Sequence, residues 1–512
     1  MQRPPRFAAR RALMLVALAV VVAWPLVSDT GPARAQEAAV PTPTAAVTSR
    51  IAPGRLAAIM DASNRQLDYL PGEVLVRFRD GVTTDGLQRT LSGVRSQPSL
   101  ASLRWSSNNL AVLHDVREPD AHVLAGQLRL QPDVLWAEPN YLRRPHRLQP
   151  NDPGFTSLQW NMRAIDMPRA WDINPGGDAN IIVAIVDSGV TTQTTVLSLK
   201  TFDGTSIRDI QVPIAINPDL SASKLISAID LVSLEGIVAD FDGHGTHVAS
   251  TVGEDANDLA EVGVAYNVRI MPVKVCFGFW DVQFALADEG EAATPPRTTA
   301  GCPDDAIAEG IRYAADHGAK VINVSLGGAG SSETLRDALL YAVSKGAFVA
   351  LSAGNGFEDG NEVEYPAAYA AEIDGVMSVG AIGPTRARAY YSGTASGTEI
   401  AAPGGDFRQG APEASLIWQA SLYAPDSTPG VVLFPRFDGY VDVGEQGTSM
   451  ASPHVAGFAA LLMSQGVTSP AAVEALIKAT AADLGSPGRD DEYGFGLIQP
   501  RAAMRGFGIF GE

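Results

Sequence analysis

The chain has 512 residues, of which 38 are Lys or Arg and 57 are Asp or Glu, and its net charge is −19. The charge is uneven, because residues 151–512 carry 20 basic and 45 acidic side chains and so have a net charge of −25. This part of the chain repels phosphate backbones, which excludes nucleic acid as an expected partner; the acidic excess indicates either solubility or attraction of cationic substrates.

Residues 1–35 have the features of an export signal. A basic start ends at Arg10-Arg11, residues 12–27 form an apolar run, and Ala33-Arg34-Ala35 matches the A-x-A cleavage pattern. A membrane anchor is the alternative interpretation, and outside this segment no run is long and apolar enough to span a bilayer. We therefore expect a secreted protein, periplasmic or extracellular, without a stable membrane anchor; Sec and twin-arginine export both stay open.

The following segments predict a small domain before a larger one. Residues 36–60 predict a linker, since their first part is rich in Ala, Pro and Thr. Residues 61–148 predict a small α+β unit, with strands at 73–78, 110–116 and 134–139 and a helix at 121–130. A basic, proline-bounded stretch at 143–150 is the expected boundary with the domain over residues 151–512.

Strands and helices alternate in the larger domain. Short apolar runs lie at 181–186, 268–275, 320–325, 347–352 and 376–381, and helical stretches between them include 304–316 and 333–345. Continuous apolar runs are typical of parallel strands that are buried on both faces. The alternation predicts an α/β fold with a doubly wound, mostly parallel sheet.

Cys276 and Cys302 are the two cysteines of the chain. In the oxidising compartment that export implies, we expect them to form a disulfide across the loop-like segment between them. Two unpaired cysteines are the alternative.

Three polar motifs are expected at the carboxyl edge of the sheet, where open α/β sheets gather their functional groups. The first is Asp187, which directly follows the apolar run 181–186 and precedes a glycine turn. A carboxylate in this position can fix the tautomer of a histidine. For this motif alone, a simple turn aspartate is the alternative.

The second motif is Asp242-Gly-His244-Gly-Thr-His247, at the expected start of a helix. We expect His244 to be a base, because the glycines beside it allow close approach, and His247 to pack inside the fold. A metal site made by both histidines is disfavoured, since His-x-x-His lacks the helical Glu of H-E-x-x-H.

The third motif surrounds Ser449, which follows Gly447-Thr and is expected to open a helix. The N–H groups and the dipole of a helix N-terminus stabilise negative charge, which favours a nucleophilic serine at this place. His454, further along the same helix, is expected to be structural.

In the order Asp, His, Ser, the three motifs together resemble the subtilisin-like serine proteases, or subtilases, for which this order is known. The resemblance runs from about residue 159 to 503, with further matches at 322–328, 352–356, 365–366 and 493–496. It implies a subtilisin-like fold and a serine endopeptidase for protein or peptide substrates. In such an enzyme Ser449 would attack the peptide bond, His244 would transfer the proton and Asp187 would orient His244. Asn355 would supply the side-chain donor of the oxyanion hole.

The same resemblance assigns substrate contacts. Ser325, Leu326 and Gly327 would pair with the substrate backbone as an added strand. Glu364, just before Tyr365-Pro366, would lie at the base of the main specificity pocket and favour Lys or Arg before the cleaved bond. The alternative is that a short loop carries Glu364 out to solvent.

Residues 61–148 resemble the subtilase propeptide, an inhibitor-like domain that assists folding. This implies an autoprocessed precursor that is cut between about Leu142 and Asp152 and is transiently inhibited by its own propeptide. We expect a monomer that needs no cofactor for catalysis, and the sequence does not identify the oligomeric state. The resemblance allows structural calcium, at sites that the sequence does not identify, and it does not identify the natural substrate.

Three segments are longer than in the compact family pattern. They are the stretch between Asp187 and His244, residues 277–303 and residues 404–445. We expect all three near the substrate cleft, which leaves the residue preference at the cleaved bond open.

Two other functions fit the chain less well. A catalytically idle binding or chaperone protein with this fold would have a broken triad, whereas all three positions are intact here. An esterase of the α/β-hydrolase type would carry G-x-S-x-G, whereas the serine lies in Gly447-Thr-Ser449-Met-Ala451.

Overall fold

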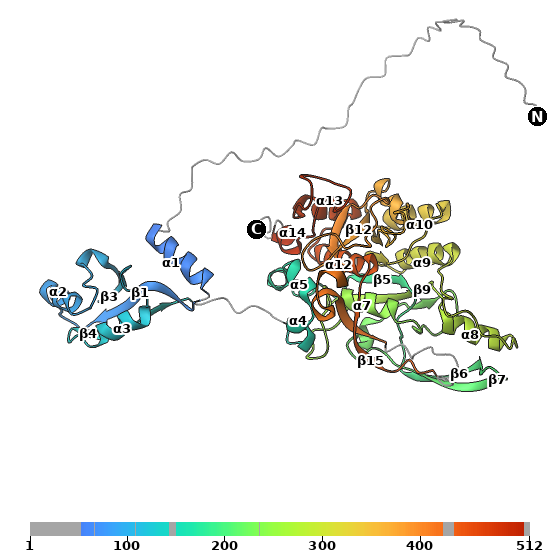
Figure 1. Cartoon of the computed structure of the whole chain (residues 1–512), viewed down its shortest axis with the longest axis horizontal. Helices are drawn as coiled ribbons and strands as arrows, with labels where there is room; N and C mark the ends of the chain where they lie inside the picture. Colours follow the sequence, from blue (N-terminus) through green and yellow to red (C-terminus); the bar gives the residue numbers. More distant parts are fainter. Residues whose placement is uncertain are drawn as a thin grey trace, which may run out of the picture. The chain divides into compact units, whose positions relative to one another are not determined.

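The computed structural model describes residues 53–65, 67–107, 109–142, 150–234, 236–422 and 435–505. The chain divides into two compact units, Met1–Arg144 and Pro145–Glu512, and each is described by itself (Figure 1). The predicted export signal at residues 1–35 and residues 143–149 of the predicted boundary lie outside the described residues. Within the described ranges, no helix is long and apolar enough to cross a membrane.

The first unit, as far as it is described, is an antiparallel sheet of four strands in the order β2-β3-β1-β4, with helices packed on it. Its elements are α1 (Pro53–Asn64), β1 (Tyr69–Phe78), α2 (Thr84–Ser92), a 3₁₀ turn (Leu100–Ser102), β2 (Leu103–Ser107), β3 (Leu110–His114), α3 (Ala121–Arg129) and β4 (Val134–Tyr141). Val74, Val76 and Phe78 alternate along β1 and share one apolar core with Leu124 and Leu128 of α3. The unit therefore has an α+β architecture.

Three elements of the first unit depart from the sequence expectation. Helix α1 begins at Pro53, so the end of the segment predicted as a linker, residues 36–60, is helical. Ala58 and Ala62 of this helix are buried and α1 packs against β1, contacts that a linker-like composition does not reveal. Helix α2 and strand β2 are also not predicted, because α2 is mostly polar and β2 exposes Arg104 and Trp105.

The second unit is built, within the described residues, on a sheet of seven strands in the order β13-β12-β11-β10-β5-β9-β8, and each neighbouring pair is parallel. The strands are β5 (Ile182–Asp187), β8 (Ile229–Asp230), β9 (Arg269–Lys274), β10 (Val321–Val324), β11 (Phe348–Ser352), β12 (Val376–Ile382) and β13 (Ile400–Pro403). Strands β8 and β9 lie on one side of β5 and strands β10 to β13 on the other. The strand order therefore reverses at β5, which opens a crevice at its carboxyl end.

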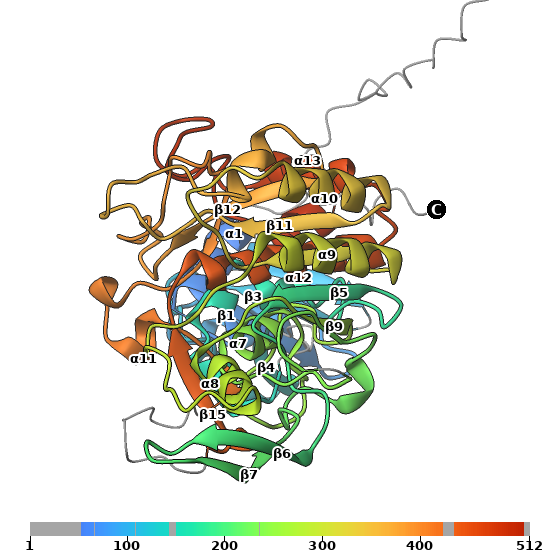
Figure 2. The same cartoon turned by 90° about the vertical axis from the view of Figure 1, so that its right-hand side faces the viewer.

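Helices cover both faces of this sheet (Figure 2). Along β5, Val183 and Ile185 point into one apolar core, and Ala184 and Val186 point into the other. Helices α7 (His244–Gly253) and α12 (Thr448–Ser464) pack in the first core, and α9 (Asp304–Asp316) and α10 (Glu333–Ser344) pack in the second. This confirms the predicted doubly wound α/β sheet.

The remaining helices of the second unit are shorter or peripheral. They are α4 (Pro153–Ser157), α5 (Trp160–Ala164), α6 (Met167–Ala170), α8 (Phe279–Asp288), α11 (Pro412–Ser415), α13 (Pro470–Thr480) and α14 (Pro500–Arg505). Further 3₁₀ turns lie at Ala222–Lys224, Ala367–Ala371 and Phe407–Gln409.

The three long segments fold as additions to the sheet. The first contains an antiparallel hairpin of β6 (Thr195–Phe202) and β7 (Ile207–Ile214), and the third contains the antiparallel pair β14 (Ile417–Leu422) and β15 (Tyr440–Glu445). The second contains α8, and its ends are joined by a disulfide between Cys276 and Cys302 with an S–S distance of 2.05 Å. The predicted disulfide is thereby confirmed.

Candidate active site

Asp187 is the last residue of the central strand β5 and is 2% exposed. Its Oδ1 accepts a hydrogen bond from the backbone N–H of Ser188 at 2.7 Å and lies 2.7 Å from Nδ1 of His244. Because a carboxylate can only accept, Nδ1 of His244 carries a proton, and in the neutral imidazole Nε2 is then the nitrogen with the lone pair. The two side chains thus have the arrangement of a base and the acid that orients it.

His244 is the first residue of α7, and the glycines beside it allow its position. Gly243 has a φ of 104°, in the left-handed region that favours glycine. At Gly245, a Cβ atom would lie 2.9 Å from the backbone nitrogen of Gly189, so the helix start packs directly against the turn after Asp187. This close approach brings the two catalytic candidates together.

The surroundings of His244 hold its pKa above the ordinary value. Burial acts to lower this pKa, but the charge of Asp187 and the hydrogen bond to it act to raise it, and the net direction is upward. The charges of Glu445 and Asp242 raise the pKa of His244 further. Since a base must be uncharged to take up a proton, activity that depends on His244 should increase as pH rises through this elevated pKa.

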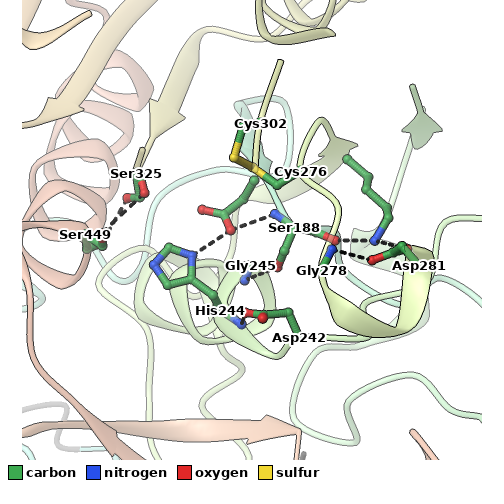
Figure 3. The surroundings of a disulfide bond; sticks show 12 residues. Ser188, Asp242, His244, Gly245, Cys276, Gly278, Asp281, Cys302, Ser325 and Ser449 are labelled. Carbon is green, nitrogen blue, oxygen red and sulfur yellow. Dashed lines mark hydrogen bonds and ion pairs between the residues drawn. A yellow bond between two sulfur atoms is a disulfide. The ribbon is translucent and has the colours of Figure 1, made fainter. Parts of the chain in front are cut away.

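Ser449 is the second residue of α12, as expected for a serine at a helix N-terminus. Its Oγ donates to the backbone carbonyl of Ser325 at 3.2 Å, and the hydroxyl of Ser325 donates back to the carbonyl of Ser449 at 2.9 Å (Figure 3). The start of α12 is therefore tied to the end of β10. The hydroxyl of Ser449 is turned towards Ser325 and not towards His244.

Asn355 lies beside the turn that precedes Ser449. Its Oδ1 accepts hydrogen bonds from the backbone N–H and the hydroxyl of Thr448, at 2.9 and 3.0 Å. The backbone N–H of Gly354 in turn donates to the Thr448 hydroxyl at 3.1 Å. These bonds fix the amide plane of Asn355 and direct its NH₂ group away from Thr448.

The segment Ser325–Gly327 runs between two cavities. One cavity of about 170 Å³ is lined by Asp187, His244 and Leu326, together with the disulfide residues. The other, of about 290 Å³, is lined by Leu326 and Gly327 and by Tyr365 from the loop opposite. Of the three long segments, residues 277–303 contribute to both cavities, and Ser188 and Asp242 of the first segment line the smaller one.

Glu364 is half-buried, and its carboxylate lies against this segment. A Cβ atom at Gly327 would be 3.2 Å from Oε2 of Glu364, and one at Gly354 would collide with the same carboxylate. The loop is held there because Gly328 and Tyr365 exchange two backbone hydrogen bonds, of 2.9 and 2.7 Å. The carboxylate of Glu364 is therefore placed between two glycine-lined stretches.

The environment of Glu364 favours its neutral form. Burial raises the pKa of this carboxyl, while the backbone N–H groups of Asn355 and Gly356 act to lower it, and the net direction is upward. A positively charged partner would favour the ionised form and compensate for this burial.

The other two histidines of the motifs are structural. His247 is fully buried and its Nε2 lies 3.0 Å from the carbonyl oxygen of Ile417. His454 is also fully buried, its Nδ1 lies 2.8 Å from the carbonyl oxygen of Met450, and burial lowers its pKa to about 4. Both therefore pack inside the fold.

Two fully buried charged residues beside the site, Asp240 and Lys274, are not predicted from the sequence. Lys274 ends β9, where it donates to the carbonyl oxygen of Ser188 at 2.8 Å and forms an ion pair of 3.1 Å with Asp281 of α8. Its position as a charged residue between Val273 and Val275, at the end of an apolar run, is the signal that could have identified it. Asp240 lies in the segment before α7 and gives no such signal.

Two buried carboxylates have oxygens without a hydrogen-bond partner. Asp152 and Asp219 are 2% and 1% exposed, and neither Oδ2 of Asp152 nor either oxygen of Asp219 has a hydrogen-bond partner of good geometry, although the side chain of Asn257 lies near enough to Asp219 to act against the rise of its pKa. Burial raises the pKa of Asp219 to about 7, and the charge of Asp152 adds to the rise. In the described part of the chain, no group of three or more His, Cys, Asp or Glu could hold a metal ion. A cation here would need these two carboxylates plus amide or backbone oxygens, which calcium accepts.

The chain is similar in sequence to a known protein family and to characterised members of it. Residues 178–496 match the model of the subtilase family. Fervidolysin from Fervidobacterium pennivorans is 30% identical over 475 residues, which cover 86% of this chain and 59% of that protein. A thermophilic serine proteinase from Bacillus sp. strain AK1 is 30% identical over 85% of this chain and 88% of its own length.

A solved structure is also similar. The crystal structure of fervidolysin matches 85% of this chain and 61% of its own chain, with 25% sequence identity and a TM-score of 0.49. The chain thus spans about three fifths of fervidolysin and most of the Bacillus proteinase.

Proposed function

The chain belongs to the subtilase family of serine endopeptidases, and from this premise we propose that Asp187, His244 and Ser449 are its catalytic triad. The single observation that best supports the proposal is the 2.7 Å approach of Asp187 Oδ1 to His244 Nδ1. It leaves Nε2 as the acceptor that a serine nucleophile needs. The substrates are proteins or peptides, as the family implies.

In the proposed reaction, Ser449 first rotates its hydroxyl from the carbonyl of Ser325 to Nε2 of His244. His244 takes the proton as Oγ of Ser449 attacks the peptide carbonyl, and Asp187 stabilises the imidazolium that forms. The tetrahedral intermediate collapses when His244 gives the proton to the leaving amine. Water then enters, and the same base activates it to hydrolyse the acyl-enzyme.

Two donors would stabilise the oxyanion of the intermediate. The first is the side-chain NH₂ of Asn355, whose orientation follows from the hydrogen bonds that its Oδ1 accepts from Thr448. The second is the backbone N–H of Ser449, in the first turn of α12, where intrahelical partners are lacking. Donors that are fixed in advance cost no reorganisation when charge develops.

The substrate backbone would pair with Ser325, Leu326 and Gly327. This segment leaves the sheet at β10 and lines both cavities, so an extended peptide can add to it as a strand. The residue before the cleaved bond would then meet Glu364. We propose that this carboxylate selects Lys or Arg at that position.

We also propose that the chain is exported and matures by cutting itself. The supporting observations are the signal-like residues 1–35, the oxidised cysteine pair and a compact α+β unit ahead of the peptidase unit. That unit would act as the folding aid and transient inhibitor. N-terminal sequencing of the secreted protein should find a start between Leu142 and Asp152, and a fully active form that starts near Gln36 would overturn this assignment.

Calcium is proposed as a structural ion, held by Asp152 and Asp219. The unpartnered oxygens of these buried carboxylates support the proposal, because uncompensated buried charge is costly. When bound, the ion would neutralise the carboxylates and stabilise the fold, and it would take no part in the reaction. We propose that the peptidase acts as a monomer.

Fluorophosphonate labelling tests the proposed nucleophile. Such reagents react with activated serines, so peptide mapping of the labelled chain should find the adduct on Ser449. The same labelling of an Asp187→Asn variant should be much slower, because His244 then lacks its orienting carboxylate. A label on another serine, or equal rates for both proteins, would refute the assignment.

A further inference from the structure

Asp240 accepts hydrogen bonds from backbone N–H groups at the start of the helix that carries His244. It is fully buried. Its Oδ1 accepts from the backbone N–H groups of Asp242 and Gly243, at 3.0 and 2.9 Å. Its Oδ2 accepts from the backbone N–H and the hydroxyl of Thr246, at 3.0 and 2.6 Å. One carboxylate thus serves both the turn before His244 and the first turn of α7.

Ser188 connects the same carboxylate to Asp187. The hydroxyl of Ser188 donates to Oδ1 of Asp240 at 3.1 Å and accepts from the backbone N–H of Gly245 at 2.8 Å. The backbone N–H of Ser188 donates to Oδ1 of Asp187 at 2.7 Å. Figure 3 shows Ser188 linked to Gly245, next to His244. The end of β5 and the start of α7 are therefore joined through Ser188 and Asp240.

We infer that Asp240 is a positioning residue for the catalytic base: through Ser188 and the first turn of α7, it holds the imidazole of His244 against Asp187. The inference rests on the proposed role of His244. Its physical basis is that the carboxylate of Asp240, which can only accept hydrogen bonds, is surrounded by five donors. They are the hydroxyl of Ser188, the backbone N–H groups of Asp242 and Gly243, and the backbone N–H and hydroxyl of Thr246. A buried carboxylate at a helix N-terminus is also favoured by the helix dipole.

Asp240→Asn is the most informative change, because it keeps the shape of the side chain. An amide has one acceptor oxygen, so whichever way the new side chain turns, its NH₂ group faces at least two of the donors. The start of α7 should then shift relative to Asp187. A displacement of about 1 Å in a catalytic group can cost about 10²-fold in rate.

The experiment compares steady-state kinetics of the full-length chain and its variants over a range of pH, with active sites counted by fluorophosphonate titration. For Asp240→Asn we expect kcat to fall about 10²-fold, with KM within about twofold of the wild type. The acid limb of the kcat profile should move to lower pH, because His244 loses part of the influence of Asp187. A side chain that only stabilises the helix would leave this limb in place.

Asp490→Asn is the control, at a carboxylate with similar hydrogen bonds that is only half-buried. Asp490 also accepts three backbone hydrogen bonds at a turn, from Ser486, Glu492 and Tyr493, at 2.8, 3.0 and 2.8 Å. It lies in the loop after α13 and touches none of the candidate catalytic residues. Its variant should keep the wild-type kcat, KM and pH profile. A loss of kcat in the control equal to that of Asp240→Asn would overturn the inference.

Ser188→Ala covers the case in which Asp240→Asn does not fold. It removes the two hydrogen bonds of the Ser188 hydroxyl and leaves the other four that Asp240 accepts, so kcat should fall about tenfold with the same direction of shift in the acid limb. In the double variant the effects should not add, because both changes break the same connection. An unshifted acid limb in the folded variants would overturn the inference. Failure of the proposed function would look different, since Ser449→Ala would then keep its activity.

Discussion

Two replacements of Glu364 separate the charge of the proposed specificity pocket from its shape. Glu364→Gln keeps the length of the side chain and removes its negative charge, and Glu364→Gly removes the side chain altogether. In the structure the carboxylate touches the stretch at Gly354 and lies close to Gly327, so the glycine variant should deepen the pocket. We expect the first variant to lose its preference for Lys and Arg, and the second to gain one for Phe and Leu.

The size of the effect follows from a charge pair in a partly buried pocket. Two unit charges about 4 Å apart attract by about 4 kcal/mol at an effective dielectric constant of about 20. Desolvation of both charges cancels part of this attraction. We expect a net preference of about 2 kcal/mol, which corresponds to about 30-fold in kcat/KM between a Lys and a neutral side chain of similar size.

The assay is kcat/KM on peptides that differ only in the residue before the cleaved bond. Wild-type enzyme should lose its preference for Lys as pH falls through the raised pKa of Glu364, because a neutral carboxyl no longer attracts the ammonium group. Because burial raises this pKa, the ionised form of Glu364 lowers the free energy of unfolding at pH values above the pKa. Glu364→Gln should therefore have a thermal midpoint at pH 7 that is at least as high as that of the wild type. An unchanged residue preference in both variants would refute the reasoning.

Three further predictions follow from the charges and cross-links of the peptidase unit. Glu445→Gln should move the acid limb of the kcat/KM profile to lower pH, because Glu445 helps to raise the pKa of His244; a limb that stays in place would contradict this. Replacing Cys276 and Cys302 together by Ser should lower the free energy of unfolding by about 3–4 kcal/mol on the chain-entropy model, and denaturant titration showing a loss below about 1 kcal/mol would count against it. EDTA should lower the thermal midpoint of unfolding, and added calcium should restore it. In Asp219→Asn the midpoint should no longer depend on calcium. Equal midpoints of the wild type with and without the chelator would exclude the calcium proposal.

The sequence predicts the parallel sheet and the location of the candidate triad because both depend on local signals. The strands of the sheet are buried on both faces, so each is a short, continuous apolar run. Asp187 ends one such run, and His244 and Ser449 lie in the first turns of their helices beside glycines. A polar residue at the end of an apolar run and a glycine before a helix are both visible without tertiary contacts.

Features that depend on packing between distant segments are not predicted. The hydrogen bond from Ser449 to Ser325 joins residues 124 positions apart. The ion pair of Lys274 with Asp281 becomes necessary only because α8 covers the end of β9 and excludes water. The unpartnered oxygens of Asp219 likewise follow from burial by segments far along the chain. None of these contacts leaves a periodic pattern in the sequence.

Short and amphipathic elements of the first unit are missed for a related reason. Helix α1 is linker-like in composition, and only the burial of Ala58 and Ala62 marks it as part of the unit. Strand β2 has five residues and is mostly exposed, so its pairing with β3 determines its structure more than its own sequence does.

Casein hydrolysis by the Ser449→Ala variant tests the central claim most directly. The variant should fold as the wild type does, because the change removes one hydroxyl from a helix start, and it should show no hydrolysis above the uncatalysed rate. It should also stay a full-length precursor after export, since self-cutting requires the same nucleophile. Normal maturation and casein cleavage by Ser449→Ala would contradict the account.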